Sequence, residues 1–236
     1  MVNKSCAFAV LCVSMWALPV LAASRTATIL FFVESEQGMN PHATRMLVTP
    51  GFVRIDDGND AADFLLFDRA SDTIYTTNSI DQRILVIRRQ PVTLHAPERF
   101  THRSEQDGQS YPPISGHKVV HYRLFTNERL CFEIYASKGL LPVAQQALRE
   151  FHTVLAGEQA SLAQRRPQSM QSACELANNV FLPSHYLDYG FPIWQQDMRG
   201  ARRRLVDYKT GVRVEPRLFE LPQGYRRFTM DELHRP

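Results

Sequence analysis

The sequence holds residues that could do chemistry, but few of them are spaced for it. His117 and His121 share one face of an expected strand, yet four strand residues span about 13 Å, too far for both to ligate one metal ion. The acidic run from Asp56 to Asp63 has the composition of a calcium loop but lacks the alternating ligands and distal Glu of an EF-hand. We interpret that run as a polar turn and predict no metal site.

The motifs that mark common catalytic sites are missing from the sequence. It has no glycine-rich phosphate loop, no His-Glu-x-x-His pair and no Gly-x-Ser-x-Gly elbow. Cys131 as a nucleophile would need a histidine partner that the spacing does not identify, so a structural role is favoured. We therefore predict no catalytic residue, no cofactor and a protein that is not an enzyme.

A cluster of arginines is the candidate for contact with an anion. Arg202, Arg203 and Arg204 follow one another, and Arg199 precedes them closely. Guanidinium groups in such a cluster could pair with lipid phosphates or with an acidic partner. A solvated turn between two strands is the simpler explanation of the same cluster.

The first 23 residues have the organisation of a secretory signal peptide. Lys4 precedes an apolar run over residues 7–18, and small residues at Ala22 and Ala23 supply a cleavage site. The run is shorter than the roughly 20 residues that a membrane-spanning helix needs. We expect a secreted, periplasmic protein with no transmembrane segment once the signal is removed. Removal also lowers the formal charge from +3 to +2, a balance that indicates no nucleic-acid partner.

Two cysteines remain after the signal, Cys131 and Cys174. An even count in an exported chain indicates a disulfide bond, and two buried free thiols are the alternative. The difficulty is geometric, because Cys131 alternates away from the apolar face of its expected strand, residues 130–136. A bond to Cys174 therefore requires either a bend at the strand end or a second helix that reaches the other face.

The elements that would position these residues are mainly strands. Residues 140–162 carry apolar side chains at helical spacing and predict one long amphipathic helix, and residues 168–180 predict a shorter one. The proline-rich residues 90–116 predict a long loop with a brief strand at 92–95. Apolar stretches between turn residues predict strands at 28–35, 44–56, 63–68, 73–77, 83–88, 117–125, 130–137, 190–194, 204–209 and 212–219.

These elements are enough for one domain with one sizeable core. We predict that the domain covers residues 24–225 and that a loose tail follows at 226–236. Short separators between successive strands favour antiparallel pairing. A long helix among such strands indicates an α+β fold, in which a curved antiparallel sheet is covered by the long helix and the shorter second helix.

Two expected strands, residues 64–67 and 84–87, are apolar on both faces. One face can meet the helix, and the other needs cover from within the fold, from a partner or from a pocket for an apolar ligand. Cover within the fold is the simplest of these. If a cavity lies between sheet and helix instead, we expect its lining to be Phe64, Leu66, Leu85, Ala144, Leu148 and Phe151.

The order of elements resembles the LolA/LolB-like superfamily, and is closest to its periplasmic members of unknown function. The resemblance rests on the exported start, the strand meander through residues 46–56, 64–68 and 73–75, the long helix, and the return to strands ending at 218–222. It implies an unclosed antiparallel β-barrel whose open side is covered by helices, with an apolar cavity between them. No position here matches a ligand-contacting residue of that family's lipoprotein carriers.

We therefore expect a non-enzymatic binding module that holds a lipid or other apolar ligand between sheet and helix. The alternative is a sensor or assembly subunit of the cell envelope that uses the same fold to bind a protein partner. Co-purified lipid would favour the first role, and a stoichiometric protein the second.

Overall fold

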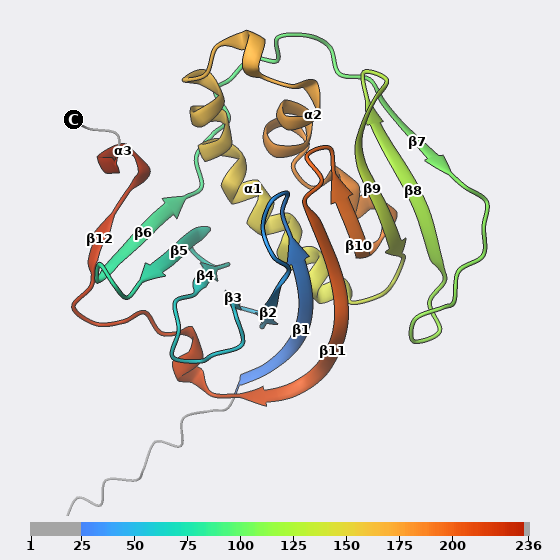
Figure 1. The fold of residues 1–236 in the computed structure, drawn as a ribbon. Coiled ribbons are helices and arrows are strands. Elements are labelled where there is room, and N and C mark those ends of the chain that lie inside the picture. The colour runs from blue at the N-terminus through green and yellow to red at the C-terminus, as the bar shows by residue number, and fades with distance from the viewer. Residues whose placement is uncertain (1–24, 234–236) are drawn as a thin grey trace, which may run out of the picture.

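The computed structural model describes residues 25–233, which form a large, open, mostly antiparallel sheet with several helices (Figure 1). The strand order is β12-β6-β5-β4-β3-β2-β1-β11-β10-β9-β8-β7. Only β12 and β6 pair in parallel among these strands. The fold class is therefore α+β, as predicted. The expected signal peptide, residues 1–23, lies outside the described residues.

The strands of the first half follow the predicted stretches closely. Residues 44–56 are two strands rather than one, because a turn at Pro50 and Gly51 reverses the chain. Residues 92–95 are not a strand, whereas β7 lies within the segment expected to be a loop. The strands are β1 (Arg25–Ser35), β2 (His42–Val48), β3 (Phe52–Asp56), β4 (Leu65–Asp68), β5 (Thr73–Asn78), β6 (Arg83–Arg88), β7 (His102–Gln106), β8 (Val119–Thr126), β9 (Arg129–Ser137), β10 (Phe191–Asp197), β11 (Arg202–Val214) and β12 (Arg226–Phe228).

The long helix is present, but the second predicted helix is not one helix. Residues 168–180 break into a 3-10 turn, a short α-helix and a π-helical turn. The α-helix starts afresh at Ser172, whose hydroxyl accepts a hydrogen bond from the amide of Glu175 at 3.0 Å. The helical elements are α1 (Pro142–Gln164), η1 (Gln168–Met170), α2 (Ala173–Leu176), η2 (Ala177–Phe181), η3 (His185–Tyr189), η4 (Pro216–Phe219) and α3 (Met230–Leu233).

The end of the chain differs from the prediction in two places. Residues 204–209 and 212–219 were expected as separate strands, but β11 runs through Gly211 and pairs with β1 along its length, and η4 follows it. Residues 226–233, expected in a loose tail, form β12 and α3. The amide of Arg226 also donates a hydrogen bond to the carbonyl of Gln82 at 2.9 Å. Residues 226–233 are therefore part of the fold.

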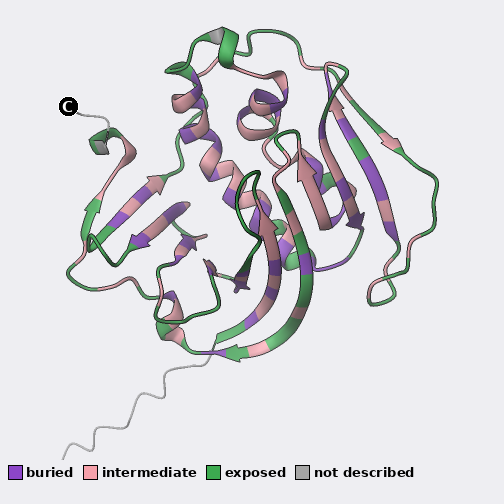
Figure 2. Ribbon diagram, viewed as in Figure 1, coloured by how far each residue is buried: buried purple, intermediate pink, exposed green. Residues whose placement is uncertain are grey.

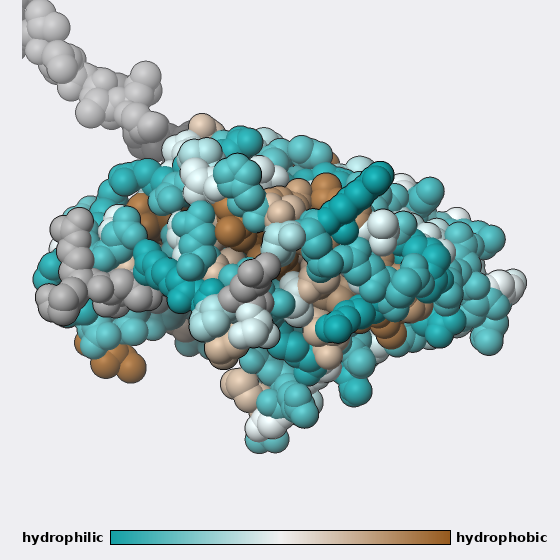
Figure 3. Space-filling model, turned by 90° about the horizontal axis from the view of Figure 1, so that it is seen from above, coloured by the Kyte–Doolittle hydropathy of each residue, from teal (hydrophilic) through white to brown (hydrophobic). Residues whose placement is uncertain are grey.

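The main core lies between α1 and the sheet that curves around it (Figures 1 and 2). Ala144 and Leu148 of α1 pack there with sheet residues such as Leu30 and Phe67, and all four are buried. A second cluster lies on the opposite side of the sheet, where η4 and the end of β11 cover the first strands. On the face seen from above, hydrophobic side chains form separate groups among hydrophilic ones (Figure 3).

The predicted disulfide bond between Cys131 and Cys174 is present, with 5.3 Å between the two Cα atoms. Its geometric difficulty is solved by a bulge in β9. Leu124 pairs with Phe132 and Phe125 pairs with Leu130, so Cys131 has no partner residue across the ladder. The extra residue bends the strand end and lets the Cys131 side chain meet α2.

Candidate functional site

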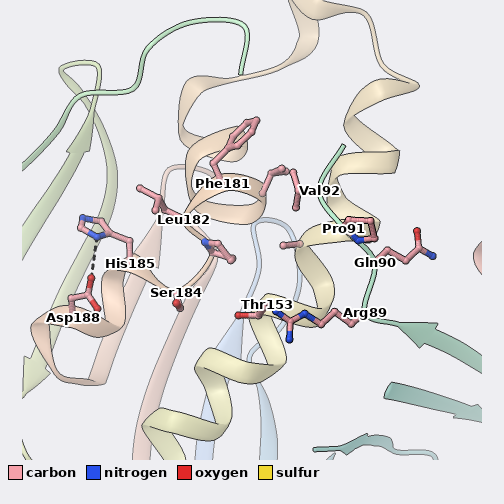
Figure 4. Close-up of a pocket in the computed structure, with 13 residues that line it drawn as sticks. Arg89, Gln90, Pro91, Val92, Thr153, Phe181, Leu182, Ser184, His185 and Asp188 are labelled. Carbon is pink, nitrogen blue, oxygen red and sulfur yellow. Dashed lines mark hydrogen bonds and ion pairs between the residues drawn. The ribbon is translucent and has the colours of Figure 1, made fainter. Parts of the chain in front are cut away.

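A pocket of about 750 Å³ lies on the flank of α1 (Figure 4). One side is the start of residues 89–101, a segment that crosses α1 between β6 and β7 and that we call the strap. The other side is the chain from Val180 to Asp188, at η2 and η3, and the floor is α1 at Thr153 and Ala156. The pocket is therefore built from three segments far apart in the sequence.

The middle of the pocket is apolar. Val92 of the strap and Phe181 of η2 lie side by side there (Figure 4), and Leu182 and Ala156 also line the pocket. Val92 is 38% exposed and Leu182 43% exposed, so apolar surface is open to solvent here. Phe181 is held from behind by Phe100 of the strap, with 5.6 Å between the ring centroids. An apolar group of a ligand could occupy this space and cover that surface.

Charged and polar groups stand at the two ends of the pocket. At one end Arg89 forms an exposed ion pair with Asp72 at 3.0 Å. At the other end Asp188 contacts His185 at 3.3 Å (Figure 4) and Arg149 at 2.8 Å. The pocket therefore has an apolar middle between two polar ends.

The six residues expected to line a cavity between sheet and helix are not brought together. Ala144, Leu148 and Phe151 belong to the packed main core, whereas Phe64 and Leu66 belong to the cluster on the opposite side of the sheet. The sixth residue, Leu85, lies opposite Phe228 of β12. None of the six lines the pocket beside α1. Both faces of the strand at residues 64–67 are covered by the protein itself, which was the simpler alternative.

The three arginines expected to meet an anion point to different sides of β11. Arg203 faces inward, stacks on Phe32 with 3.9 Å between its guanidinium carbon and the ring centroid, and contacts Glu34 at 3.1 Å. Arg202 and Arg204 are exposed on the outer face. All three lie in the strand, so the expectation of a solvated turn is also wrong for them. Successive side chains of a strand point to opposite faces, so Arg203 lies on the other side of β11 from Arg202 and Arg204.

Arg203 belongs to a polar group under α1 that sequence reasoning missed. His152 of α1 and Tyr186 of η3 share a hydrogen bond of 2.9 Å. Burial, and after it the charge of Arg203, lowers the pKa of His152 to about 4, and burial raises the pKa of Tyr186 to about 12. The residues come from three separate elements, so no local spacing could have revealed the group.

His121 forms a second network, on the outer face of the sheet. Its two ring nitrogens contact carboxylate oxygens of Asp107 at 2.8 Å and Glu133 at 2.9 Å. A hydrogen bond from Tyr111 is the main reason why the pKa of Asp107 is lowered. His117 is not part of this network, and its ring lies instead beside Gly139. Among residues 25–233, no group of three or more His, Cys, Asp or Glu side chains is arranged to hold a metal ion.

The acidic run after β3 is a turn, but its first residue has a structural role. Asp57 is exposed in the turn, whereas Asp56 is buried and accepts hydrogen bonds from Arg45 at 2.8 Å and from Arg54 at 2.6 Å. Burial by itself raises the pKa of Asp56, but the hydrogen bonds from the two arginines outweigh it and lower that pKa. Asp56 is thus an ion-paired carboxylate.

None of the helices in residues 25–233 combines the length and the apolar character needed to cross a membrane. α1 has the length, but it carries charged residues such as Arg149 and Glu150.

No protein-family model and no curated protein matches the chain. Among solved structures, an uncharacterized conserved protein from Thermus thermophilus is similar at 9% identity, with a TM-score of 0.44, over 87% of this chain and 91% of that one. Two structures of PNGF-II are similar at 12% and 9% identity, each with a TM-score of 0.42 and over 88% of this chain. The chain spans about a third of PNGF-II, 31% and 32% in the two structures. Likenesses this low identify neither a family nor an activity.

Proposed function

We propose that the protein is an exported, periplasmic module that binds a lipid or other apolar ligand without transforming it. The binding site is the pocket between α1, the strap and the chain from Val180 to Asp188. Its volume of about 750 Å³ is in the range of small-molecule sites, and its apolar middle with polar ends suits an amphipathic molecule. The proposed architecture is an unclosed barrel of the LolA/LolB-like kind, with α1 and the shorter helices across its open side.

The observation that carries this proposal is the apolar surface left open in the pocket. Val92 and Leu182 are exposed there although both lie beside the buried flank of α1. Exposed apolar side chains that line a concave site are a common mark of ligand binding. The site differs from the one expected from sequence, because the space between helix and sheet is filled by side chains of the main core.

A pair of matched substitutions on α1 tests the site. Ala156 lines the pocket and Ala144 lies in the main core. Ala156→Trp should fill the pocket and weaken binding of a fluorescent fatty acid about tenfold or more, since even a modest loss of contacts has that effect. Ala144→Trp should instead overpack the core and cost about 1 to 3 kcal/mol of stability.

Leu182→Gln is a second test that disturbs packing less, because Leu182 is 43% exposed and Gln has a similar size. It should weaken fatty-acid binding while the melting temperature stays close to that of the wild type. Absence of binding by the wild-type protein, or equal binding by all four proteins, would remove the proposed function.

A role as a sensor or assembly subunit has its own supporting observation. Met39 and Met198 are 60% and 46% exposed, and they line one hollow of about 560 Å³ between two hairpin turns. Leu130, 42% exposed, lines a neighbouring hollow with Met198. Exposed apolar side chains on adjacent turns could contact a protein partner. A native mass spectrum of protein purified from its own periplasm would show a stoichiometric protein in this case and a lipid in the other.

A further inference from the structure

A row of four side chains crosses the outer face of the sheet from β8 to β11. His121 lies opposite Tyr135, Tyr135 opposite Trp194, and Trp194 opposite Arg204. We call the first three, His121, Tyr135 and Trp194, the aromatic row, and Arg204 lies at its end. They point away from α1, because the residues on either side of Arg204 in β11 are Arg203, which packs inward on Phe32, and Leu205, which is buried in the main core.

The row is held rigidly. The ring of Tyr135 stacks on His121 with 4.6 Å between centroids and an angle of 20°, and its edge meets Trp194 at 5.6 Å. Tyr111, from the loop after β7, packs edge-on against Tyr135 at 5.0 Å. His121 is in turn fixed by its two carboxylate partners. His121 is only 8% exposed, so it and Tyr111 serve to hold Tyr135 and Trp194 in place. Ring positions fixed in advance reduce the entropy cost of binding a molecule there.

Positive charge adjoins the row on the side of Trp194. Arg204 forms no ion pair with any side chain in residues 25–233, and the Arg202 guanidinium donates only to the neutral amide of Gln196, at 2.7 Å. The cross-strand neighbours of these arginines on β1 are uncharged, Val33 and Ser35. Two guanidinium groups without carboxylates thus stand beside an indole ring on an open face.

No acidic side chain in residues 25–233 forms an ion pair with either arginine, although Glu36 lines a hollow together with Arg202. Glu133 lies beyond Gln196, on β9, and is bonded to His121. Asp207, farther along β11, accepts a hydrogen bond from the amide of Tyr208 at 2.8 Å. An anionic ligand is therefore the electrostatic complement of Arg202 and Arg204.

We propose that the outer face of β9 to β11 binds an acidic saccharide. The C–H groups on one side of a pyranose ring form an apolar face that can pack on the indole of Trp194, as aromatic rings pack on other apolar groups. The carboxylate or other anionic group of the sugar would pair with Arg204 or Arg202, and the Gln196 amide would meet its hydroxyls. Trp194 and Arg204 lie beside the hollow that Gln196 and Arg202 line, and an extended, repeating chain could contact the strand face and the hollow together.

This site is independent of the pocket beside α1, which lies on the other side of the sheet. An anionic membrane is the competing partner. Binding to a membrane surface needs apolar side chains that can enter the headgroup region. The large apolar ring at the charged end of the row is the indole of Trp194, which is partly buried among polar groups. The charge pattern together with the aromatic row therefore favours the saccharide.

Trp194 supplies a built-in reporter for the test. The chain has two tryptophans, Trp16 and Trp194, so the full chain with Trp16→Phe reports on the site alone. Titration with an oligogalacturonate should change Trp194 fluorescence to saturation. A neutral malto-oligosaccharide of the same length should bind about tenfold or more weakly, since it lacks the charge-assisted hydrogen bonds. Added salt should weaken the acidic ligand and leave the neutral one unchanged.

Arg204→Gln should weaken the oligogalacturonate about tenfold and leave the melting temperature unchanged, because the side chain is exposed. Arg213→Gln, which removes an exposed arginine farther along the same strand, is the matched control and should bind as the wild type does. Equal affinity for acidic and neutral sugars, or equal effects of the two variants, would overturn the proposal. So would binding to phosphatidylglycerol vesicles that depends on Arg204 while the oligogalacturonate fails to bind.

Discussion

A Cβ atom placed on Gly157 would lie 2.6 Å from the backbone carbonyl oxygen of Gln90, closer than side chains approach a backbone. Gly157 lies inside α1, where glycine is about 1 kcal/mol less favourable than alanine. Glycine is needed at this position because the backbone of the strap lies against the helix there. The same contact forms one side of the pocket.

Gly157→Ala should therefore destabilise the protein although alanine is the better helix former. Alanine improves helix propensity by about 1 kcal/mol, but its Cβ atom overpacks against the Gln90 backbone, which must move at a cost of about 1 to 3 kcal/mol. Urea unfolding measures the difference, with Gln159→Ala on the same helix as the control. The same variant should alter fatty-acid binding, because displacement of Gln90 moves one wall of the pocket. A more stable Gly157→Ala protein would contradict this account.

Removal of the disulfide bond should lower the free energy of unfolding by about 3 to 4 kcal/mol, the chain-entropy value for a loop of this length. Cys131 and Cys174 are 43 residues apart and both are buried. The double variant Cys131→Ala, Cys174→Ala should unfold at lower urea than the wild type. Reductant should shift the wild type toward the double variant and leave the double variant where it is. Two free thiols in the oxidised, denatured chain without residues 1–23, which keeps only these two cysteines, would contradict the bond.

Stability should fall between pH 6.5 and pH 4 mainly because of His152, and His102, whose pKa is also lowered by burial and then by the charge of His185, acts in the same direction. The pKa of His152 is lowered from 6.5 to about 4 by burial first and by the charge of Arg203 second. The unfolded chain takes up the proton below pH 6.5 and the folded chain only near pH 4, so stability is complete above pH 6.5 and decreases by at most about 3 kcal/mol on acidification. Urea unfolding across this range measures the slope.

His152→Gln should flatten that slope, and His95→Gln, at an exposed position, should leave it unchanged. Carboxylates with lowered pKa values affect stability at lower pH than His152 does. Asp56 and Glu150, whose ordinary values are 3.8 and 4.5, lose their stabilising contribution only below those values. An equal slope in wild type and His152→Gln would show that another group is responsible.

Arg54→Met should cost about 3 kcal/mol or more, because it breaks a buried ion pair and removes several hydrogen bonds. Arg54 is 1% exposed, binds Asp56 at 2.6 Å, donates to the Leu218 carbonyl at 2.7 Å and stacks on Phe64 at 3.9 Å. Since Leu218 belongs to η4, limited proteolysis should cleave near that segment faster in the variant. Arg217→Met, an exposed change in the same segment, is the control and should have little effect on either measurement.

The sequence was informative where structure is local. Alternating and apolar runs located most strands and α1, and the presence of only two cysteines after residue 23 identified the disulfide bond. The sequence also indicated correctly that the strand must bend for Cys131 to reach Cys174, and the β9 bulge supplies that bend. A bulge depends on the partner strand and has no signature in one strand alone.

What could not be predicted depends on pairing between distant segments. Gly211 predicted a break between two strands, yet β11 continues through it because β1 pairs with β11 along its whole length. The tail at residues 226–228 is polar and reads as loose, but the edge of β6 provides hydrogen-bond partners for it. The pocket was missed for the same reason, since the strap, α1 and the chain from Val180 to Asp188 meet only in the folded protein.

The pairing of β1 with β11 also determines when the protein can finish folding. β1 to β6 pair between neighbours in sequence and can form as soon as they are made, whereas Leu30 meets Tyr208 only after most of the chain has emerged. Closing so long a loop is slow. Until β11 arrives, one edge of β1 is an unpaired strand with the apolar sequence Ile-Leu-Phe-Phe-Val, a surface on which incomplete chains can pair with one another.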